Sequence, residues 1–537
     1  MKFRKKIALI SVFVFVVSVN GLMSISSSQG ASSKSSIVIA VAATPTSLDP
    51  EYAATPQDRE SDVSVYDRFT QFKKITKNGV VQADLLSPPV PLLAESWTVS
   101  ADKKTYTFKL RKGTKSYFGN ELTSKDVVWS WDRVFGMKSQ GLFPLNVSSI
   151  SKGSYRAIDK YTFEVTLNSP NPLLLVVLAA PVPGASIYDS VEVKKHATAS
   201  DPWGSKWLAG HTASFGPYHA TEFNPGQQVI YVANPNYYRR IPLIQKVIYR
   251  AVPEPANRMA LLQAGSVDVA EDLNAEQRNF LTGVKGVSIK STKGNLMVAF
   301  GLNNKIAPFD DVRVRQAVAE AMPIDEIKKT VYFGEASVRL FNGMVPDTFP
   351  GYPNYWPYQP QKLDHARALI ASANPSNTTF DIAYSATYQE HERIAQLIKT
   401  AMAKIGLTAN LKKLPPAAYQ ELYYGKMADS VLVQDSAFVA DPAYPLFLWF
   451  GGGPGAVANW IQYKNVEAQA TIDKALAEPN AAKRIELSLT ANRAIVDDAP
   501  WAMHLGIGFN FVSRSTVSGF VWRPHNLIHF ADLSIKK

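Results

Sequence analysis

The stretch that decides the fold is PLLAESWTVSADKKTYTFKLRKGTKSYFGNELTSKDVVWSWDRV, from Pro91 to Val134. Within it, residues Ala94 to Thr98 and Thr105 to Leu110 alternate between apolar and polar side chains. This alternation predicts two paired strands, joined by a turn at Ser100 to Lys103. The stretch shows no evident catalytic group, so it indicates a scaffold suited to binding.

A helix is predicted at the end of the same stretch, over Lys125 to Phe135. Thr123 or Ser124 can cap it, and Asp126 lies in the first turn, where the helix dipole favours an acid. The apolar side chains of this helix fall largely on one face and predict a core contact, although Trp129 can point elsewhere.

The rest of the chain is long enough for more than one core. It has 537 residues, of which 46% are hydrophobic, and single cores stop growing at roughly 250 to 300 residues. Ile37 to Val41 predicts a buried first strand, and a helix is predicted around Asp62 to Phe72. A second α/β unit follows Ser288 to Asn303, and the strand predicted over Trp501 to Val512 returns to the first unit. We therefore expect a discontinuous first lobe.

The N-terminus has the order of a secretory signal peptide. Lys2, Arg4, Lys5 and Lys6 precede an apolar run, and a small polar tract follows. A membrane anchor is the alternative, but a span needs about 20 apolar residues and polar residues interrupt this run. We expect cleavage shortly after Gly30.

Composition excludes several classes of protein. The chain has no cysteine, so disulfides, thiolate metal sites and a lipid-modified cysteine are ruled out. An exported protein without that tether is expected in the periplasm. The formal net charge of +12 falls to +8 without the four basic residues of the leader, and the remaining charges are scattered. We expect no nucleic-acid partner, since such a partner needs a concentrated basic stripe.

Five blocks, in order along the chain, resemble the segments that characterise one family. After Pro91 to Val134 they are FGPYHATEFNPGQQVIYVANPNYYR (Phe215 to Arg239), LLQAGSVDVA (Leu261 to Ala270), PFDDVRVRQAVAEAMPIDEI (Pro308 to Ile327) and RIAQLIKTAMAKIGLTANLKKL (Arg393 to Leu414). By these blocks the chain resembles the bacterial extracellular solute-binding proteins of family 5, the peptide and nickel class that serves ABC importers.

The resemblance implies a two-lobe α/β fold of the type II periplasmic-binding-protein class, with the ligand cleft between lobes. On this basis residues 1–30 form the signal peptide. Lobe I comprises 37–291 and 508–537, with an extra subdomain inserted at about 85–200, and lobe II comprises 292–507.

The resemblance also bears on the ligand. Peptide binders of the family hold the ligand's amino terminus with an aspartate shortly before an Asp-Pro pair, which here is Asp441-Pro442. Phe438 stands three places before Asp441, and the nearest acid is Asp435. The family's dipeptide binders place an arginine in the loop that matches Tyr384 to Tyr388, which has none. A zwitterionic dipeptide is therefore disfavoured, because a buried charge without its partner is costly.

The predicted cleft region instead offers aromatic and amide side chains. They suit a sugar ring, an opine-like conjugate or a peptide held through its backbone, and the alternative is that several of them pack the core. The candidate ligand-binding residues are Phe215, Asn303, Tyr388, Asp435, Phe438, Asp441, Trp449 and Trp460, and Tyr444 belongs to the same region.

Enzyme signatures are lacking. His391-Glu392 has Ala395 where HExxH needs histidine, and no GxSxG pentapeptide occurs. The glycine-rich run Gly451 to Gly455 has no Lys-Ser or Lys-Thr after it, and the eight histidines show no close metal-ligand spacing. We expect no catalytic residue, metal or cofactor, although a ligand carried as a metal chelate stays open.

The sequence thus predicts a monomeric periplasmic receptor that captures a peptide or peptide-like solute and delivers it to a membrane ABC permease. The first alternative is an oligosaccharide or opine in the same transport role. The second is an exported hydrolase that uses Asp435 and Asp441.

Overall fold

The structure is a computed structural model, and it describes residues 35–536 except 54, 86, 339–354, 359–360, 437–438, 440 and 453–457. The predicted signal peptide and Phe438 lie outside the described residues, as does most of the glycine-rich run. Within the described part of the chain, no helix is long and apolar enough to cross a membrane.

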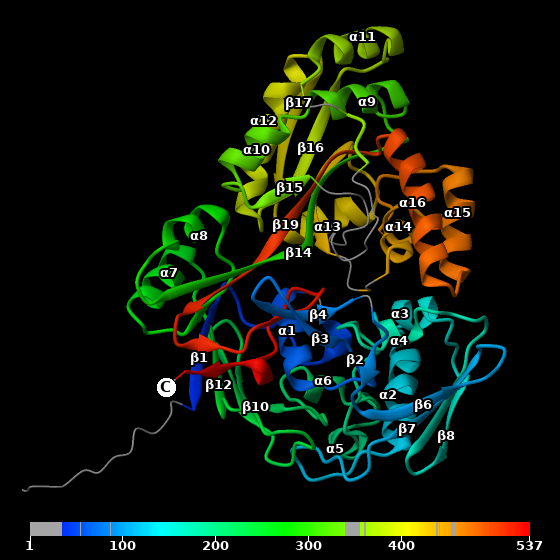
Figure 1. Cartoon of the computed structure of the whole chain (residues 1–537), viewed down its shortest axis with the longest axis vertical. Coiled ribbons are helices and arrows are strands. Elements are labelled where there is room, and N and C mark those ends of the chain that lie inside the picture. Colours follow the sequence, from blue (N-terminus) through cyan, green and yellow to red (C-terminus); the bar gives the residue numbers. More distant parts are fainter. Residues whose placement is uncertain are drawn as a thin grey trace, which may run out of the picture.

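Eleven of the described strands form one sheet that runs through both halves of the molecule (Figure 1). In order across the sheet they are β10 (Tyr218–Asn224), β11 (Gln228–Ala233), β12 (Lys246–Ala251), β1 (Ser36–Val41), β13 (Val269–Ala270), β19 (Trp501–Arg514), β14 (Val287–Leu302), β18 (Ser430–Ser436), β16 (Thr379–Ser385) and β17 (Thr408–Leu414), with β15 (Ala336–Val338) paired to β19. The predicted first strand is confirmed as β1, which is buried between β12 and β13 and parallel to both.

Two long strands, β14 and β19, connect the halves of the sheet. They pair antiparallel from Val287 opposite Arg514 to Gly301 opposite Trp501. The register shifts at the lobe II end, between Phe300 and Gly301, and also near the middle, where the step from Thr292 to Leu296 stands opposite a two-residue step on β19. A bulge of this kind bends a strand and interrupts its ladder. The lobe boundaries predicted at 291/292 and 507/508 fall at this irregularity.

Lobe I surrounds the β10 to β13 part of the sheet. Its helices are α1 (Pro56–Val65), α5 (Ser190–Lys195), α6 (Ser205–Leu208), α7 (Pro255–Gln263) and α8 (Ala275–Leu281), with the short 3-10 turns η1 (Pro50–Tyr52) and η3 (Phe530–Asp532). Small sheets are formed by β2 (Thr70–Gln71) with β5 (Val90–Pro91), by β3 (Lys73–Lys77), β4 (Val80–Asp84) and β21 (Val521–Trp522), and by β20 (Val517–Ser518) with β22 (Ser534–Ile535).

The helix predicted around Asp62 to Phe72 is wrong in its limits. Helix α1 begins earlier because Thr55 and Asp58 form a capping box around Pro56. It ends at Val65, and the chain then turns into the strands β2 and β3.

The opening stretch builds a separate layer of lobe I. Its strands β6 (Ala94–Val99) and β7 (Thr105–Leu110) pair as predicted and join β9 (Thr162–Thr166) and β8 (Tyr155–Asp159) in a four-stranded sheet. Helix α2 (Ser124–Met137) is capped by Thr123, whose backbone N–H donates to Asp126 at 2.8 Å. The short helices α3 (Leu142–Val147) and α4 (Leu174–Val177) complete this layer.

Helix α2 packs against two cores at once. Val127, Trp131 and Val134 are buried in the core of the inserted layer, which also contains Phe108. Trp129, on another face of the helix, is buried in the main core of lobe I. The helix therefore fixes the inserted layer to lobe I.

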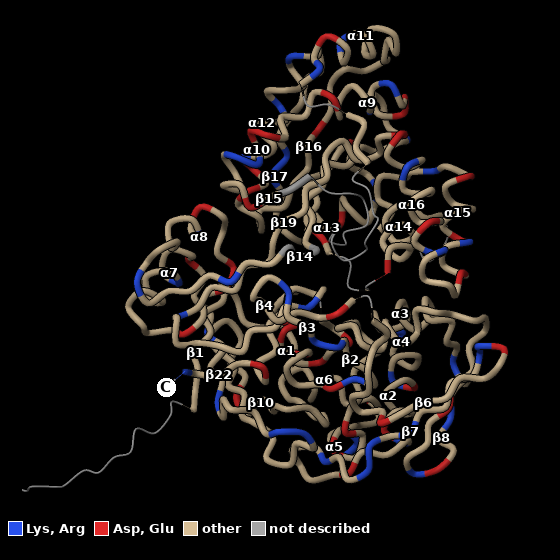
Figure 2. The backbone as a smooth tube through the Cα atoms, viewed as in Figure 1, with Lys and Arg blue, Asp and Glu red and all other residues tan. Residues whose placement is uncertain are grey.

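Lobe II has the largest core, in which helices cover the β14 to β17 part of the sheet (Figure 1). Its helices are α9 (Val312–Ala321), α10 (Ile324–Thr330), α11 (Leu363–Ala373), α12 (Gln389–Ala403), α13 (Pro416–Tyr424), α14 (Ala443–Phe450), α15 (Val466–Ala477) and α16 (Ala481–Asp497). Basic and acidic residues are interspersed along both lobes (Figure 2).

Candidate functional site

The end of β18 and the first turns of α1 bring charged side chains of the two lobes together. Strand β18 is antiparallel to the lobe II half of β14, so it runs back toward lobe I and ends at Ser436 opposite Leu296, beside the bulge. Asp435 lies at this end. Arg59 lies on α1, on the lobe I side of the boundary.

Asp435 is held in place by neighbouring donors. Its carboxylate accepts a hydrogen bond from the indole Nε1 of Trp449 at 3.1 Å and one from the backbone N–H of Ser436 at 2.7 Å. Burial raises the pKa of Asp435, whereas these two hydrogen bonds and the charge of Arg59 lower it. The carboxylate is thus held in one orientation by fixed donors.

Arg59 is the electrostatic counterpart of Asp435. Its Nε donates to the carbonyl oxygen of Ala53 at 3.5 Å. Burial lowers the pKa of Arg59, and the largest opposing contribution comes from Asp435, followed by Tyr424. An arginine on lobe I and an aspartate on lobe II therefore act on each other across the lobe boundary.

Tyrosines complete the site. Burial and the charge of Asp435 raise the pKa of Tyr388 to about 12, and the same two causes raise the pKa values of Tyr424 and Tyr444. All three hydroxyls are therefore protonated at neutral pH, and they form no hydrogen bond with the residues that the structure describes. We call Arg59, Tyr388, Tyr424, Asp435 and Tyr444 the interlobe site.

The two lobes touch on either side of this site. Tyr444 and Val439 of lobe II pack with Leu173, Val177, Ala180, Val182 and Ala185 of lobe I, a set that we call the interlobe cluster. Elsewhere the amide of Asn274 donates to Gln389 at 3.1 Å, and Arg278 forms an ion pair with Glu335. The lobes are therefore closed on each other.

The chemistry of the interlobe site suits a polar solute. Arg59 can pair with a carboxylate, Asp435 can accept from an ammonium or a hydroxyl, and the tyrosines offer both donors and aromatic faces. No described group of three or more His, Asp or Glu is placed to hold a metal ion.

Two of the predicted site residues, Tyr388 and Asp435, lie together in the interlobe site. Trp449 reaches it only through its hydrogen bond to Asp435. The indole is fully buried and packs against Trp501, with ring centroids 5.5 Å apart. Trp460 is buried too, against Tyr423 at a centroid distance of 5.1 Å. Both tryptophans are therefore core residues.

The other predicted residues have structural partners. Phe215 is fully buried in the core of the inserted layer, so it is a core residue and offers no surface to a ligand. The amide of Asn303 donates to the carbonyl oxygens of Lys426 and Ala428 at 3.2 and 2.9 Å. Asp441 pairs with Arg484 at 2.6 Å and accepts from the N–H of Ala443, the first residue of α14.

Arg59 and Tyr424 are site residues that the sequence did not reveal. Arg59 stands among acids in an ordinary helix start, and its partner lies on the other lobe. Tyr424 ends α13, where the pair Tyr423-Tyr424 divides between a buried ring and an exposed one. The several tyrosines of α13 are the feature of the sequence that could have indicated Tyr424.

A family comparison agrees with this architecture. The model of the bacterial extracellular solute-binding proteins, family 5, matches residues 88–456, and the chain belongs to this family. Its members are solute-binding proteins, and the fold is the two-lobe type II periplasmic-binding-protein fold.

Individual proteins show similarity over almost the full length. A probable D,D-dipeptide-binding periplasmic protein of Escherichia coli is 27% identical over 91% of this chain and 92% of its own. The periplasmic binding protein DppA of Helicobacter pylori, solved with the peptide STSA, has a TM-score of 0.81 and 23% identity over 94% of this chain and 98% of its own. A protein of A. tumefaciens R10 solved with mannopinic acid has a TM-score of 0.77 and 26% identity over 94% of this chain and all of its own.

Proposed function

We propose that this protein is a periplasmic receptor that captures a peptide or peptide-like solute between its lobes and delivers it to a membrane ABC permease. The observation that carries the proposal is the interlobe site, where an aspartate of lobe II interacts electrostatically with an arginine of lobe I, among tyrosine hydroxyls that no described residue engages. Family membership and the dipeptide-binding relative support it.

The closed arrangement fits capture by lobe closure. A solute that contacts both Arg59 and Asp435 favours the closed state by its differential affinity for that state. Tyr388 and Asp435 keep their predicted role as ligand contacts in this proposal, and Arg59, Tyr424 and Tyr444 join them. Phe438 stays a proposed contact, because it follows Asp435 closely in sequence.

The proposal extends to processing and to lobe limits. Residues 1–30 are a signal peptide that is removed on export, lobe I comprises 37–291 and 508–537, and lobe II comprises 292–507. The mature chain acts as a monomer with no nucleic-acid partner. Hydrolysis is disfavoured, because Asp441 is occupied by Arg484 and is not available as a partner of Asp435.

An opine-like conjugate is the second candidate ligand. The relative solved with mannopinic acid and the aromatic character of the interlobe site favour it. Such a conjugate carries carboxylates for Arg59 and hydroxyls for Asp435 and the tyrosines, without requiring a dedicated ammonium site.

The test combines ligand identification with a charge-removing variant. Native mass spectrometry of the purified protein identifies any co-purified solute, and calorimetry then compares D-Ala-D-Ala, L-Ala-L-Ala and mannopinic acid. We expect Asp435→Asn to weaken binding of the accepted solute at least about tenfold, or about 1.4 kcal/mol. Glu486→Gln, on an exposed face of α16, is the matched control and leaves the affinity unchanged.

Three outcomes would count against the proposal. If nothing co-purifies and no compound of a broad panel binds, the receptor function fails. If Asp435→Asn and Glu486→Gln bind equally well, the interlobe site is wrong. Micromolar binding of a simple dipeptide that survives Asp435→Asn would place the ammonium anchor elsewhere.

A further inference from the structure

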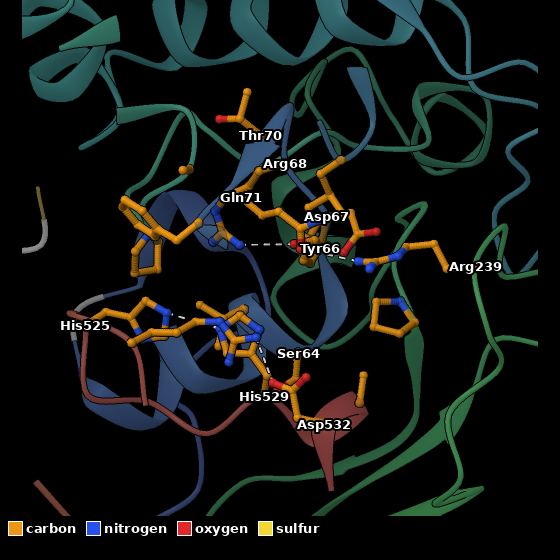
Figure 3. A pocket seen from close by; sticks show the side chains of 18 of the residues that line it. Ser64, Tyr66, Asp67, Arg68, Thr70, Gln71, Arg239, His525, His529 and Asp532 are labelled. Carbon is orange, nitrogen blue, oxygen red and sulfur yellow. Dashed lines mark hydrogen bonds and ion pairs between the residues drawn. The ribbon is translucent and has the colours of Figure 1, made fainter. Parts of the chain in front are cut away.

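A second polar site lies inside lobe I. Its walls come from the segment that follows α1 into β2 and β3, from turns at Pro217 and Tyr237, and from the C-terminal segment around His525 to Asp532 (Figure 3). Its cavity volume is about 90 Å³, and it is partly open to solvent. No residue of the interlobe site is among the described residues that line it, and we call it the lobe I pocket.

Positive charge dominates the wall of the lobe I pocket. Four cationic side chains line it, and only two carboxylates do. The cations are Arg68, Lys74, Arg239 and Arg523, and the carboxylates are Asp67 and Asp532. Arg68 also pairs with Asp62, which is not part of the wall, so four cations stand against three carboxylates, and this surplus of one positive charge favours an anion.

The two carboxylates of the pocket are already engaged. Asp532 lies 2.6 Å from Lys74 Nζ and 2.7 Å from Arg523 Nη2. Asp67 accepts hydrogen bonds from the hydroxyls of Tyr237 and Tyr238 at 3.0 and 2.7 Å. These hydrogen bonds stabilise Asp67 without using any of the four cations.

An N–H donor of one arginine in the pocket wall also has no acceptor among the described residues. Arg68 is 5% exposed and pairs with Asp62 through Nη2, but its Nε is buried and has no hydrogen-bond partner among the described residues. Nη1 of Arg239 donates to Gln71 at 3.3 Å, and Arg239 also interacts with Tyr237 and with the charge of Asp67, which raise its pKa against the effect of burial. A buried donor without a partner is unfavourable, and a bound acceptor removes that cost.

The hydrogen bonds of His525 and His529 fix which ring nitrogen of each histidine carries the proton. The backbone N–H of Leu527 donates to Nδ1 of His525 at 3.2 Å, so that nitrogen carries no proton. His525 therefore carries its proton on Nε2 and donates to Nε2 of His529 at 3.1 Å. His529 must then hold its proton on Nδ1, where no described residue accepts it.

Both histidines stay neutral because of their surroundings. Burial, followed by the charge of Arg523, holds the pKa values of His525 and His529 well below the ordinary range. Burial also lowers the pKa of Lys74. Burial, aided by the neighbouring cations, thus keeps both histidines neutral, and His529 is an N–H donor beside those cations.

From this arrangement we propose that the lobe I pocket binds a small oxyanion, either inorganic phosphate or the carboxylate of a small organic acid, independently of the solute between the lobes. The anion accepts from His529 Nδ1–H and pairs with Arg523 and Arg239. Guanidinium groups suit this task, because their planar N–H groups match the geometry of oxyanions.

Calorimetry of the full mature protein tests the proposal with sodium phosphate and sodium acetate as probes, each at constant ionic strength made up with sodium chloride. We expect one phosphate or acetate per chain. Arg523→Gln and Arg239→Gln each weaken this binding at least about tenfold, since each removes a charge-assisted contact. Lys73→Gln, an exposed neighbour outside the pocket wall, is the matched control and binds as the wild type does.

Arg239→Gln also guards against misfolding, because Arg239 is exposed and its loss leaves the Asp532 ion pairs intact. Imidazole NMR provides a second readout, in which the signals of His529 shift on titration with the bound anion. The interlobe variant Asp435→Asn should retain anion binding, so failure of the receptor proposal and failure of this one are distinguishable.

The proposal is overturned if neither probe binds at millimolar concentration or if the His529 signals do not move. It is also overturned if Lys73→Gln loses as much affinity as Arg523→Gln, since that result indicates a general effect of charge. Preference for phosphate or for acetate identifies which kind of oxyanion the pocket takes.

Discussion

Glu51 provides a sharp test of how lobe I holds its inserted layer. Its side chain is 1% exposed, accepts the N–H of Gly184 at 2.9 Å, and accepts the hydroxyl of Ser139. Burial is the largest cause that raises the pKa of Glu51 from 4.5 to about 7, and the charge of Asp49 adds to it, while Ser139, Arg133 and Gly184 oppose it. The test variant is Glu51→Gln, because glutamine has nearly the same side-chain shape as glutamate but no ionisable group.

The sign of the effect follows from proton binding. Between pH 4.5 and about pH 7 the folded state keeps the Glu51 proton and the unfolded chain releases it, so stability falls as pH rises through this window. A pKa difference from 4.5 to about 7 corresponds to about 3 kcal/mol, at about 1.4 kcal/mol for each pKa unit. That contribution is fully present below pH 4.5 and lost above about pH 7.

Urea unfolding followed by tryptophan fluorescence measures this difference. At about pH 5 the Glu51→Gln variant and the wild type should have similar free energies of unfolding, and at about pH 8.5 the variant should be more stable by about 3 kcal/mol. Glu95→Gln, on an exposed strand position, is the control and should follow the wild type. A difference between Glu51→Gln and the wild type that does not change with pH would refute the reasoning.

Two further predictions concern an ion pair within lobe I and the contact between the lobes. Arg133→Met leaves Asp49 buried without its ion pair, so the free energy of unfolding should fall by about 3 to 5 kcal/mol, and adding Asp49→Leu should restore most of it. An equal loss in the single and double variants, by urea unfolding, would contradict this. Tyr444→Ala removes the largest lobe II side chain of the interlobe cluster, so small-angle scattering should show a larger radius of gyration. An unchanged radius would mean that this cluster does not hold the lobes closed.

The sequence predicted local structure best where several signals agreed. Thr123, Asp126 and the apolar spacing of α2 all indicated the same helix, and the structure confirms it with the same cap. Around α1, the predicted helix from Asp62 to Phe72 took no account of the capping box at Thr55, which sets the start of the helix. Local chemistry therefore decided where the elements begin.

The candidate site was only partly predictable, for a physical reason. Residue type alone does not distinguish an aromatic ligand contact from an aromatic core residue, and Phe215 and Trp460 proved to be buried. Arg59 was missed because its role depends on Asp435, which lies on the other lobe and is far away in sequence. Contacts between lobes arise only from the folded arrangement.

The bulge near Thr292 has a mechanical consequence. It interrupts the β14–β19 ladder between two regularly paired segments, so a rotation of the lobes can be absorbed as bending at this position. Opening of the lobes then need not break ladder hydrogen bonds on either side of the bulge, and the two strands act as a hinge that opposes the rotation only weakly. The free-energy difference between the open and closed states then depends mainly on the side chains that meet between the lobes. A small solute that contacts these side chains can shift the equilibrium toward the closed state.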